Sequence, residues 1–241
     1  MTGVAGKTYW VVGASEGVGR ELAKNLSTNG ASLILSARNA ARLDDLCARL
    51  PNARALPLDV TDQDAISRAF AGITRLDGVV YNAGVYDPMP TAIWNSGAAL
   101  HMLDVNFAGA VRVLGEVVPR FQSQGHGDIT IIGSLAGYRG LPKSIGYGAS
   151  KAALISLAET MRFDLKDSGV VVRIANPGFI KTRLTDKNDF DMPMLMSPER
   201  AARHVFKAMQ SKRFRTDFPR PFSWFIRAID LLPDVVVYRG K

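Results

Sequence analysis

Short apolar runs alternate along the chain with longer stretches in which apolar residues recur at helical spacing. The apolar runs have the length and β-branched content of buried strands, and they cover residues 8–12, 31–36, 53–58, 76–81, 129–132 and 170–175. The amphipathic stretches predict helices over residues 20–26, 40–50, 62–72, 98–122, 148–166 and 197–210. Strands that alternate with helices are typical of an α/β domain, so we predict a doubly wound parallel sheet of about seven strands.

The length and composition fit one domain. At 241 residues, with 47% hydrophobic and 22% charged residues, the chain is predicted to form a single domain over residues 1–241. Cys47 is the one cysteine, which excludes an internal disulfide and favours a reducing, cytoplasmic location. The three histidines are scattered along the sequence, so we expect no metal site. We also expect no secretory signal and no membrane-spanning helix, because no apolar run approaches about 18 residues.

The positive charge of the chain is concentrated at its C-terminal end. The net charge is +8; residues 199–241 hold ten Lys or Arg against four Asp or Glu, whereas the other 198 residues hold twenty against eighteen. No nucleic-acid-binding motif accompanies these basic residues, and a scattered surplus usually lies on a solvated surface. We therefore expect no nucleic-acid partner.

A glycine-rich turn follows the first predicted strand. Residues 13–19 read Gly-Ala-Ser-Glu-Gly-Val-Gly and lead directly into a helical pattern. Glycines allow a pyrophosphate to approach the backbone, and a helix N-terminus offers free N–H groups to an anion. The turn therefore predicts a dinucleotide site, although an ordinary tight strand–helix turn would have the same composition.

The turn after the second predicted strand indicates which dinucleotide is bound. It reads Ser36-Ala37-Arg38. A carboxylate at this turn would accept hydrogen bonds from the adenosine ribose, whereas an arginine would bind a 2′-phosphate. Arg38 therefore favours NADP(H), with NAD as the second choice. The simpler interpretation is that Arg38 only begins a helix on the surface.

Three polar side chains suited to proton transfer follow the strand over residues 129–132. Ser134 lies just beyond this strand, at the edge where parallel sheets bind ligands. Tyr147 and Lys151 are four residues apart, so they share one face of the helix predicted there. A phenol has a pKa of about 10 and a nearby ammonium favours its ionised form, so we expect Lys151 to lower the pKa of Tyr147. Tyr147 could then exchange a proton near neutral pH.

The segment from Ser134 to Lys151 closely resembles the active-site segment of the classical short-chain dehydrogenase/reductase family. The Gly-x-x-x-Gly-x-Gly turn, the Asn82-Ala83-Gly84 triplet and the Pro177-Gly178 turn are also similar to motifs of that family. The resemblance covers residues 7–183 and implies a Rossmann-like fold that binds NAD(P).

The chain departs from the family pattern at two positions. Val12 replaces the usual threonine before the first glycine, and Glu16 stands where NADP-using members often have a basic residue. Ala37 occupies the position of an NAD-selecting aspartate, so the absence of that carboxylate and the presence of Arg38 still favour NADP(H).

The resemblance implies a catalytic group of Asn106, Ser134, Tyr147 and Lys151. Tyr147 would exchange the proton, Ser134 would hydrogen-bond the substrate oxygen, and Lys151 would hold the nicotinamide ribose. Asn106 would lie at a helix irregularity and support a water that contacts the lysine. The cofactor-binding residues that the resemblance implies, with Asp59 and Val60 against the adenine, are Gly13, Ser15, Gly17, Val18, Gly19, Ser36, Ala37, Arg38, Asp59, Val60, Asn82, Ala83, Gly84, Tyr147, Lys151, Pro177, Gly178, Ile180 and Thr182.

The implied reaction is hydride transfer between the nicotinamide of NADP(H) and the carbon of a carbonyl or secondary alcohol substrate. The alternative is a non-catalytic NADP(H)-binding regulatory protein on the same fold, since a fold alone does not determine a function. The resemblance also implies a homodimer or homotetramer, with subunit contacts through the helices near residues 100–122 and 148–166.

Two segments near the C-terminus have their own patterns. Residues 183–197 show no periodicity, and the resemblance implies a substrate lid there. The tail, residues 218–241, is basic and has apolar residues at helical spacing before Pro233, namely Phe222, Phe225, Ile226 and Ile229. This pattern predicts a short helix whose apolar face packs on the domain beside the lid and closes an apolar cleft. The alternative is that this face and the nearby arginines dock on an anionic membrane surface.

Overall fold

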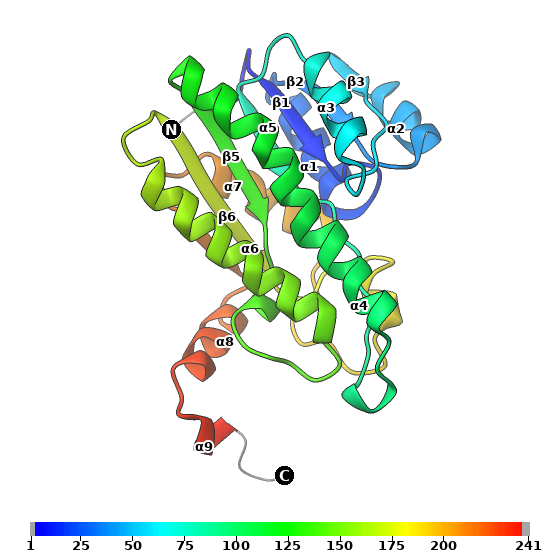
Figure 1. The fold of residues 1–241 in the computed structure, drawn as a ribbon, viewed down its shortest axis with the longest axis vertical. Helices are drawn as coiled ribbons and strands as arrows, with labels where there is room; N and C mark the ends of the chain where they lie inside the picture. Colours follow the sequence, from blue (N-terminus) through cyan, green and yellow to red (C-terminus); the bar gives the residue numbers. More distant parts are fainter. Residues whose placement is uncertain (1–2, 238–241) are drawn as a thin grey trace.

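The six predicted strands and one further strand form a seven-stranded parallel sheet with helices on both faces (Figure 1). The computed structural model describes residues 3–237. The strand order is β3-β2-β1-β4-β5-β6-β7, which confirms the doubly wound, Rossmann-like sheet. The strands are β1 Thr8–Val12, β2 Ser32–Ser36, β3 Ala53–Ala55, β4 Gly78–Tyr81, β5 Gly127–Ile132, β6 Val170–Pro177 and β7 Arg215–Phe218.

Amphipathic helices connect the strands and cover the sheet. They are α1 Gly17–Thr28, α2 Ala40–Cys47, α3 Gln63–Ala71, α4 Ser96–Leu103, α5 Gly109–Gln124, α6 Ile145–Asp164, α7 Pro198–Met209, α8 Phe222–Asp230 and α9 Asp234–Val237. The apolar stripes of α1, α2 and α7 form one buried cluster with the sheet, and those of α3, α5 and α6 form another on the opposite face. Two cores of this kind explain why β1 and β4 have consecutive apolar side chains, over residues 9–12 and 79–81.

The reversal of strand order between β1 and β4 fixes the position of the site. In open α/β sheets, ligands bind beyond the carboxyl ends of the strands at such a switch point. Figure 1 shows these ends pointing toward the half of the molecule that contains α4, the loop before α7 and the C-terminal α8.

Two strands differ from their predicted bounds. The third was predicted over 53–58 but ends at Ala55. The chain still runs beside β2 after Ala55, because the N–H groups of Leu56 and Leu58 donate to the carbonyl oxygens of Leu35 and Ala37. β7 was not located from the sequence, because it lies at the edge of the sheet and its residues, Arg-Thr-Asp-Phe, do not form an apolar run.

The helix predicted over 98–122 is two helices. Residues Asp104–Ala108 form a π-helical turn between α4 and α5, and Asn106 lies within it. The irregularity expected at Asn106 is therefore present.

The tail contains the predicted short helix, α8, which ends before Pro233. A further turn of helix, α9, follows that proline, and residues 238–241 of the predicted tail lie outside the described residues. No helix among residues 3–237 combines the length and apolar character needed to cross a membrane. The homo-oligomer stays a prediction; Val111 and Phe163, on the helices expected at the subunit contact, are 44% and 76% exposed.

Candidate active site

A cleft of about 1150 Å³ opens at the carboxyl ends of the strands. Most of the predicted site residues line it, on the segments that follow the strands β1 to β6 and on α6. The structure thus brings together predicted site residues that are as far apart in the chain as Gly13 and Thr182. The predicted residues that do not line the cleft are Gly19, Ser36 and Asn106.

The glycine turn has a shape that only glycine allows. Gly13 has a φ of 91°, and a Cβ there would lie 2.5 Å from the backbone nitrogen of Ala83. A Cβ on Gly19 would lie 2.1 Å from the carbonyl oxygen of Gly13. Gly19 therefore lies on the side of the turn away from the cleft and allows α1 to pack closely against the backbone of Gly13. The first turn of α1 therefore faces the cleft with its free N–H groups and contains no acidic residue.

Ser36 supports this turn from below. Its carbonyl oxygen accepts hydrogen bonds from the N–H groups of Gly13 and Ala14, at 2.7 and 3.0 Å. Its hydroxyl accepts a hydrogen bond from the indole of Trp10 inside the protein, and the residue is fully buried. Ser36 therefore shapes the glycine turn without lining the cleft, contrary to the direct contact that was expected.

A group of charged side chains surrounds the end of the cleft next to β2. Arg38 and Arg42 both line the cleft, and no carboxylate of the described residues forms an ion pair with Arg38. Glu16 accepts from Arg42 at 2.6 Å and from Arg183 at 2.7 Å. The charge of the Glu16 carboxylate, which would disfavour NADP(H), is therefore neutralised by two guanidinium groups. Arg42 was not among the predicted site residues, although its place four residues after Arg38, in the first turn of the next helix, could have indicated it.

Asp59 and Val60 line the same end of the cleft. One carboxylate oxygen of Asp59 accepts from the backbone N–H and the hydroxyl of Thr61, at 2.9 and 2.8 Å. Burial alone would raise the pKa of Asp59, but these hydrogen bonds and the nearby Arg38 hold it below its usual value. The two hydrogen bonds from Thr61 therefore hold the Asp59 carboxylate in place through Oδ1, and Oδ2 accepts no hydrogen bond from Thr61.

The Asn82-Ala83-Gly84 triplet lies between the glycine turn and the predicted catalytic residues Asn106 and Lys151. The Asn82 side chain donates to the carbonyl oxygen of Gly13 at 2.8 Å. A Cβ on Gly84 would lie 3.4 Å from Oδ1 of Asn106 and 3.9 Å from Nζ of Lys151. The small residue thus leaves room beside both side chains.

Asn106 connects three parts of the site through its buried amide. Its Oδ1 accepts from the N–H of Val85 at 2.7 Å, and its Nδ2 donates to the Val85 carbonyl at 3.0 Å and to the Ser150 hydroxyl at 2.9 Å. Ser150 in turn donates to the carbonyl oxygen of Tyr147 at 2.7 Å. These contacts offset the cost of an asparagine within a helix. Asn106 is thus a bridge between the end of β4 and the first turn of α6.

Ser134 and Tyr147 meet across the cleft. Ser134 follows β5, and its hydroxyl also accepts from the N–H of Ala136, at 3.1 Å, in the 3₁₀ turn Leu135–Gly137. Tyr147 lies in the first turn of α6 and is hydrogen-bonded to Ser134. Burial raises the pKa of Tyr147, and the Ser134 hydrogen bond only partly opposes that rise.

Lys151 does not lower the pKa of Tyr147 in this structure, so that expectation is wrong for the protein alone. Its Nζ lies 5.6 Å from the centre of the Tyr147 ring and donates to the carbonyl oxygen of Ile132 at 2.9 Å. Burial lowers the pKa of Lys151 itself to about 8. The sequence showed the shared face of the helix, but it could not show that Lys151 is buried and Tyr147 half-buried.

The Pro177-Gly178 turn lies opposite the glycine turn. The N–H of Gly178 donates to the carbonyl oxygen of Phe218 on β7 at 2.7 Å. A Cβ on Gly17 would lie 3.3 Å from the methyl group of Thr182, so the two turns approach closely. Ile180 is buried and pairs with Met196, which closes the base of the lid.

The predicted lid crosses the cleft and is held at several points. It contains one 3₁₀ turn, Thr185–Lys187, and otherwise has no regular structure. Asn188 accepts from the hydroxyl of Tyr86 at 2.8 Å, and Lys143 forms an ion pair with Asp189. The ring of Tyr86 lies 5.0 Å from that of Tyr147, edge to face. Tyr86 therefore connects the lid to Tyr147, a contact that no sequence signal indicated.

The helix of the tail divides its apolar residues between two directions. Phe222 and Ile226 line the cleft, as expected if the tail closes it. Phe225 was expected on the same face, but it is 61% exposed, and so is Trp224 at 60%. The helix is nine residues long and contacts the domain along one edge. Phe222 and Ile226, four residues apart, lie on that edge, whereas Phe225 does not. Membrane contact through the exposed side stays a prediction.

A protein-family model described as short chain dehydrogenase matches residues 7–192. The chain belongs to the short-chain dehydrogenase family. An uncharacterized oxidoreductase of Myxococcus xanthus is 32% identical over 242 residues, which cover 97% of this chain and 96% of that relative. A 3-oxoacyl-acyl-carrier-protein reductase of Rickettsia bellii is 29% identical and covers 78% of each chain. The protein is therefore an oxidoreductase of a family that uses NAD(P).

Solved structures of this family have the same fold. A short-chain dehydrogenase from Sphingobium yanoikuyae in complex with NADPH has a TM-score of 0.84, is 27% identical and covers 93% of this chain and 92% of its own. One from Burkholderia cenocepacia in complex with NADP has a TM-score of 0.85 at 23% identity and covers 95% of this chain and 99% of its own.

Proposed function

We propose that this short-chain dehydrogenase is an NADP(H)-dependent reductase of carbonyl compounds that also oxidises the corresponding secondary alcohols. The observation that supports this reaction is the meeting of Ser134, Tyr147 and Lys151 in one cleft with the glycine turn. Gly13 and Gly19 leave no space for a Cβ and so shape the turn, and the part of the cleft that Gly17 and Val18 line fits a pyrophosphate at the N-terminus of α1. When bound, the nicotinamide supplies or accepts the hydride.

Tyr147 is the general acid in the reducing direction. Its raised pKa keeps the phenol protonated at neutral pH, so a proton is available for the oxygen of the substrate. Ser134 is hydrogen-bonded to the phenol and can donate to the same substrate oxygen as negative charge develops there. Lys151, with its pKa of about 8, is mostly protonated at pH 7, and its ammonium would hydrogen-bond the ribose of the bound nicotinamide.

NADP(H) is the preferred cofactor in this proposal. Arg38 and Arg42 line the end of the cleft beyond β2, and Glu16 next to them is already neutralised. Two guanidinium groups at this place favour a 2′-phosphate. The complexes of related proteins with NADPH and NADP are consistent with this choice.

The test is Tyr147→Phe, assayed for NADPH oxidation with a panel of ketones and aldehydes and for NADPH binding by fluorescence. Turnover should fall by about a hundredfold or more, while the Kd of NADPH should change less than twofold, because the substitution removes a proton and little binding surface. Substantial turnover by the variant would refute the role of Tyr147. A wild-type protein that binds NADPH but reduces no carbonyl compound would favour the non-catalytic regulatory protein instead.

A further inference from the structure

The C-terminal helix α8 forms a wall of the reaction cleft. Phe222 and Ile226, one helical turn apart, line the same cleft as Tyr147. This helix lies beyond residue 192, where the match to the family model ends. The wall is therefore a feature of this chain that the family motifs do not determine.

Aromatic rings continue this wall from α8 to the lid. The ring of Phe222 lies 5.8 Å from that of Phe179, and Phe179 lies 5.7 Å from Phe190 of the lid. Leu141, in the segment between Ser134 and Tyr147, lines the cleft as well. The substrate side of the cleft thus has apolar side chains from the lid, the Pro177-Gly178 turn and α8.

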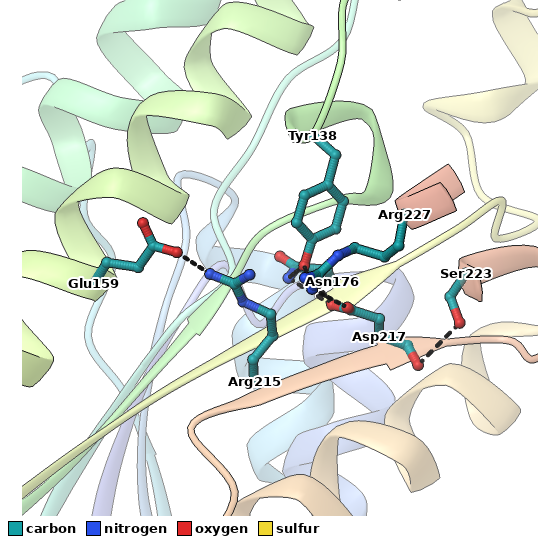
Figure 2. Close-up of polar contacts among 7 residues, drawn as sticks. All are labelled: Tyr138, Glu159, Asn176, Arg215, Asp217, Ser223 and Arg227. Carbon is teal, nitrogen blue, oxygen red and sulfur yellow. Dashed lines mark hydrogen bonds and ion pairs between the residues drawn. The ribbon is translucent and has the colours of Figure 1, made fainter. Parts of the chain in front are cut away.

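A partly buried polar cluster connects α8 to the sheet (Figure 2). Asp217 on β7 accepts from the hydroxyl of Tyr138 and from the amide of Asn176, both at 2.8 Å. Arg227 on α8 donates to the other oxygen of Asp217 at 3.3 Å and to the Tyr138 hydroxyl at 3.4 Å. Tyr138 is four residues after Ser134, and Asn176 directly precedes Pro177. The cluster therefore joins α8 to both segments that border the reacting atoms.

Tyr138 is the centre of this cluster. Its ring lies between two guanidinium groups, with Arg227 at 4.9 Å and Arg215 at 5.6 Å from the ring centre. Arg215 also pairs with Glu159 on α6, the helix of Tyr147. Burial and the Asp217 carboxylate raise the pKa of Tyr138 to about 12. The phenol thus stays a hydrogen-bond donor to Asp217 over the whole physiological pH range.

We propose that the substrate carries an extended apolar chain that lies against Phe179, Phe222 and Ile226, and that Arg227 and Asp217 position α8 for it. This inference rests on the proposed carbonyl reduction and names its substrate class. Each methylene group buried in such a site should raise kcat/KM about fourfold until the site is filled.

A series of methyl ketones from 2-butanone to 2-decanone, with NADPH, tests the site. For the wild type, kcat/KM should rise with chain length. In Phe222→Ala/Ile226→Ala the gain per methylene should fall, so that 2-decanone loses tenfold or more while 2-butanone changes little. Trp224→Ala/Phe225→Ala, on the exposed side of the same helix, is the matched control and should keep the wild-type series. A flat wild-type series, or an equal loss in both double variants, would overturn the apolar site.

A binding measurement separates this inference from the reaction itself. In Tyr147→Phe loaded with NADPH, calorimetry should detect 2-decanone more tightly bound than 2-butanone, and the added Phe222→Ala/Ile226→Ala changes should remove the difference. Binding without turnover in the wild type would refute the reductase and leave the apolar site standing. Turnover of 2-butanone without any preference for longer chains would refute only the apolar site.

The positioning role of Arg227 predicts a separate effect. Arg227→Met should raise KM for 2-decanone several-fold, while kcat for 2-butanone and the Kd of NADPH stay unchanged, because the reacting groups do not move. Arg227→Lys, which keeps the charge toward Asp217, should restore part of the loss. An unchanged KM in Arg227→Met, or equal losses for both ketones, would show that the cluster does not position the helix.

Discussion

The two sides of the cleft are held in different ways. On the glycine-turn side, residues 13–19 and Asn82–Gly84 are fixed by backbone contacts that leave no space for a Cβ and by short hydrogen bonds between turns. On the lid side, residues 183–197 and α8 are held by aromatic contacts and by ion pairs whose side chains are largely exposed. We infer from this comparison that the glycine-turn side is rigid, whereas the lid side can adapt to a substrate.

The largest loss of NADPH affinity should appear when a single methyl group is added on the glycine-turn side. In Gly19→Ala the new Cβ would lie 2.1 Å from the carbonyl oxygen of Gly13, and neither backbone segment can move without opening the turn. Overpacking of this kind costs about 1–3 kcal/mol, so NADPH affinity should fall about tenfold to a hundredfold, as measured by fluorescence titration.

Gly115→Ala is the matched control. Gly115 lies in α5, and a Cβ there would meet no atom within 4 Å. A glycine-to-alanine change inside a helix should stabilise the protein by about 0.5–1 kcal/mol, and NADPH affinity should not change. Wild-type affinity in Gly19→Ala would show that the turn is more adaptable than its geometry indicates.

The choice of cofactor tests whether charge also matters on the glycine-turn side. Arg38→Asp should reduce the preference for NADPH over NADH by about tenfold to a hundredfold, because a charge-assisted hydrogen bond is replaced by repulsion. Arg42→Met should have a smaller effect in the same direction. Glu16→Gln should strengthen NADPH binding, because it releases Arg42 from its ion pair at 2.6 Å.

The measurement is the ratio of the two dissociation constants in each variant. Equal affinity of the wild-type protein for NADPH and NADH would refute the role of Arg38. A loss of NADPH binding in Glu16→Gln would show that this carboxylate orders the arginines and does not compete with the phosphate.

Burial of Lys151 predicts a pH dependence of stability. Its pKa is about 8 in the folded protein and about 10.4 in an unfolded chain, so between these values the unfolded chain binds more protons. The free energy of unfolding should therefore rise with pH in this window, and the gain from pH 7 to pH 9.5 should be about 2 kcal/mol.

Urea denaturation of the wild type and of Lys151→Met at the two pH values checks this sign. The gain should be absent in Lys151→Met and retained in Lys166→Met, whose side chain is 70% exposed. The raised pKa of Tyr147 has the opposite effect: above pH 10 the free energy of unfolding should fall as the pH rises, because the phenol loses its proton more readily in the unfolded chain. The same pH dependence in wild type and Lys151→Met would mean that Lys151 is solvated.

The sequence predicted the glycine-turn side more fully than the lid side, and the reason is physical. Gly13 has a positive φ and Gly19 lies against the Gly13 carbonyl, so both act within one strand–helix turn that the sequence pattern predicts. Tyr147 and Lys151 share a helix, so their proximity follows from the helical period. The burial that sets their pKa values depends on Ile132 and on the rest of the core, which no local pattern contains.

The lid side depends on contacts between distant residues. Tyr86 is 102 residues from its lid partner Asn188, and Tyr138 is 79 residues from Asp217. Asp217 belongs to β7, a polar edge strand that periodicity does not reveal. The apolar spacing of the tail correctly indicated α8, but the helix faces the cleft through Phe222 and Ile226 and leaves Phe225 exposed, which depends on where β7 places it.

The smallest effect should come from the ion pairs of the lid. In Asp189→Asn the pair with Lys143 is lost; the two side chains are 68% and 39% exposed, so the melting temperature should change by less than about 2 °C. KM for a ketone substrate should nevertheless rise about two- to fivefold at low ionic strength, because Lys143 borders the cleft and holds the lid across it. In about 1 M salt, where such pairs are screened, wild type and variant should have the same KM. Asp167→Asn, which removes an exposed carboxylate remote from the cleft lining, is the control and should change neither quantity. A large loss of stability in Asp189→Asn would mean that the lid side is held as firmly as the glycine-turn side, and the contrast between the two sides would be wrong.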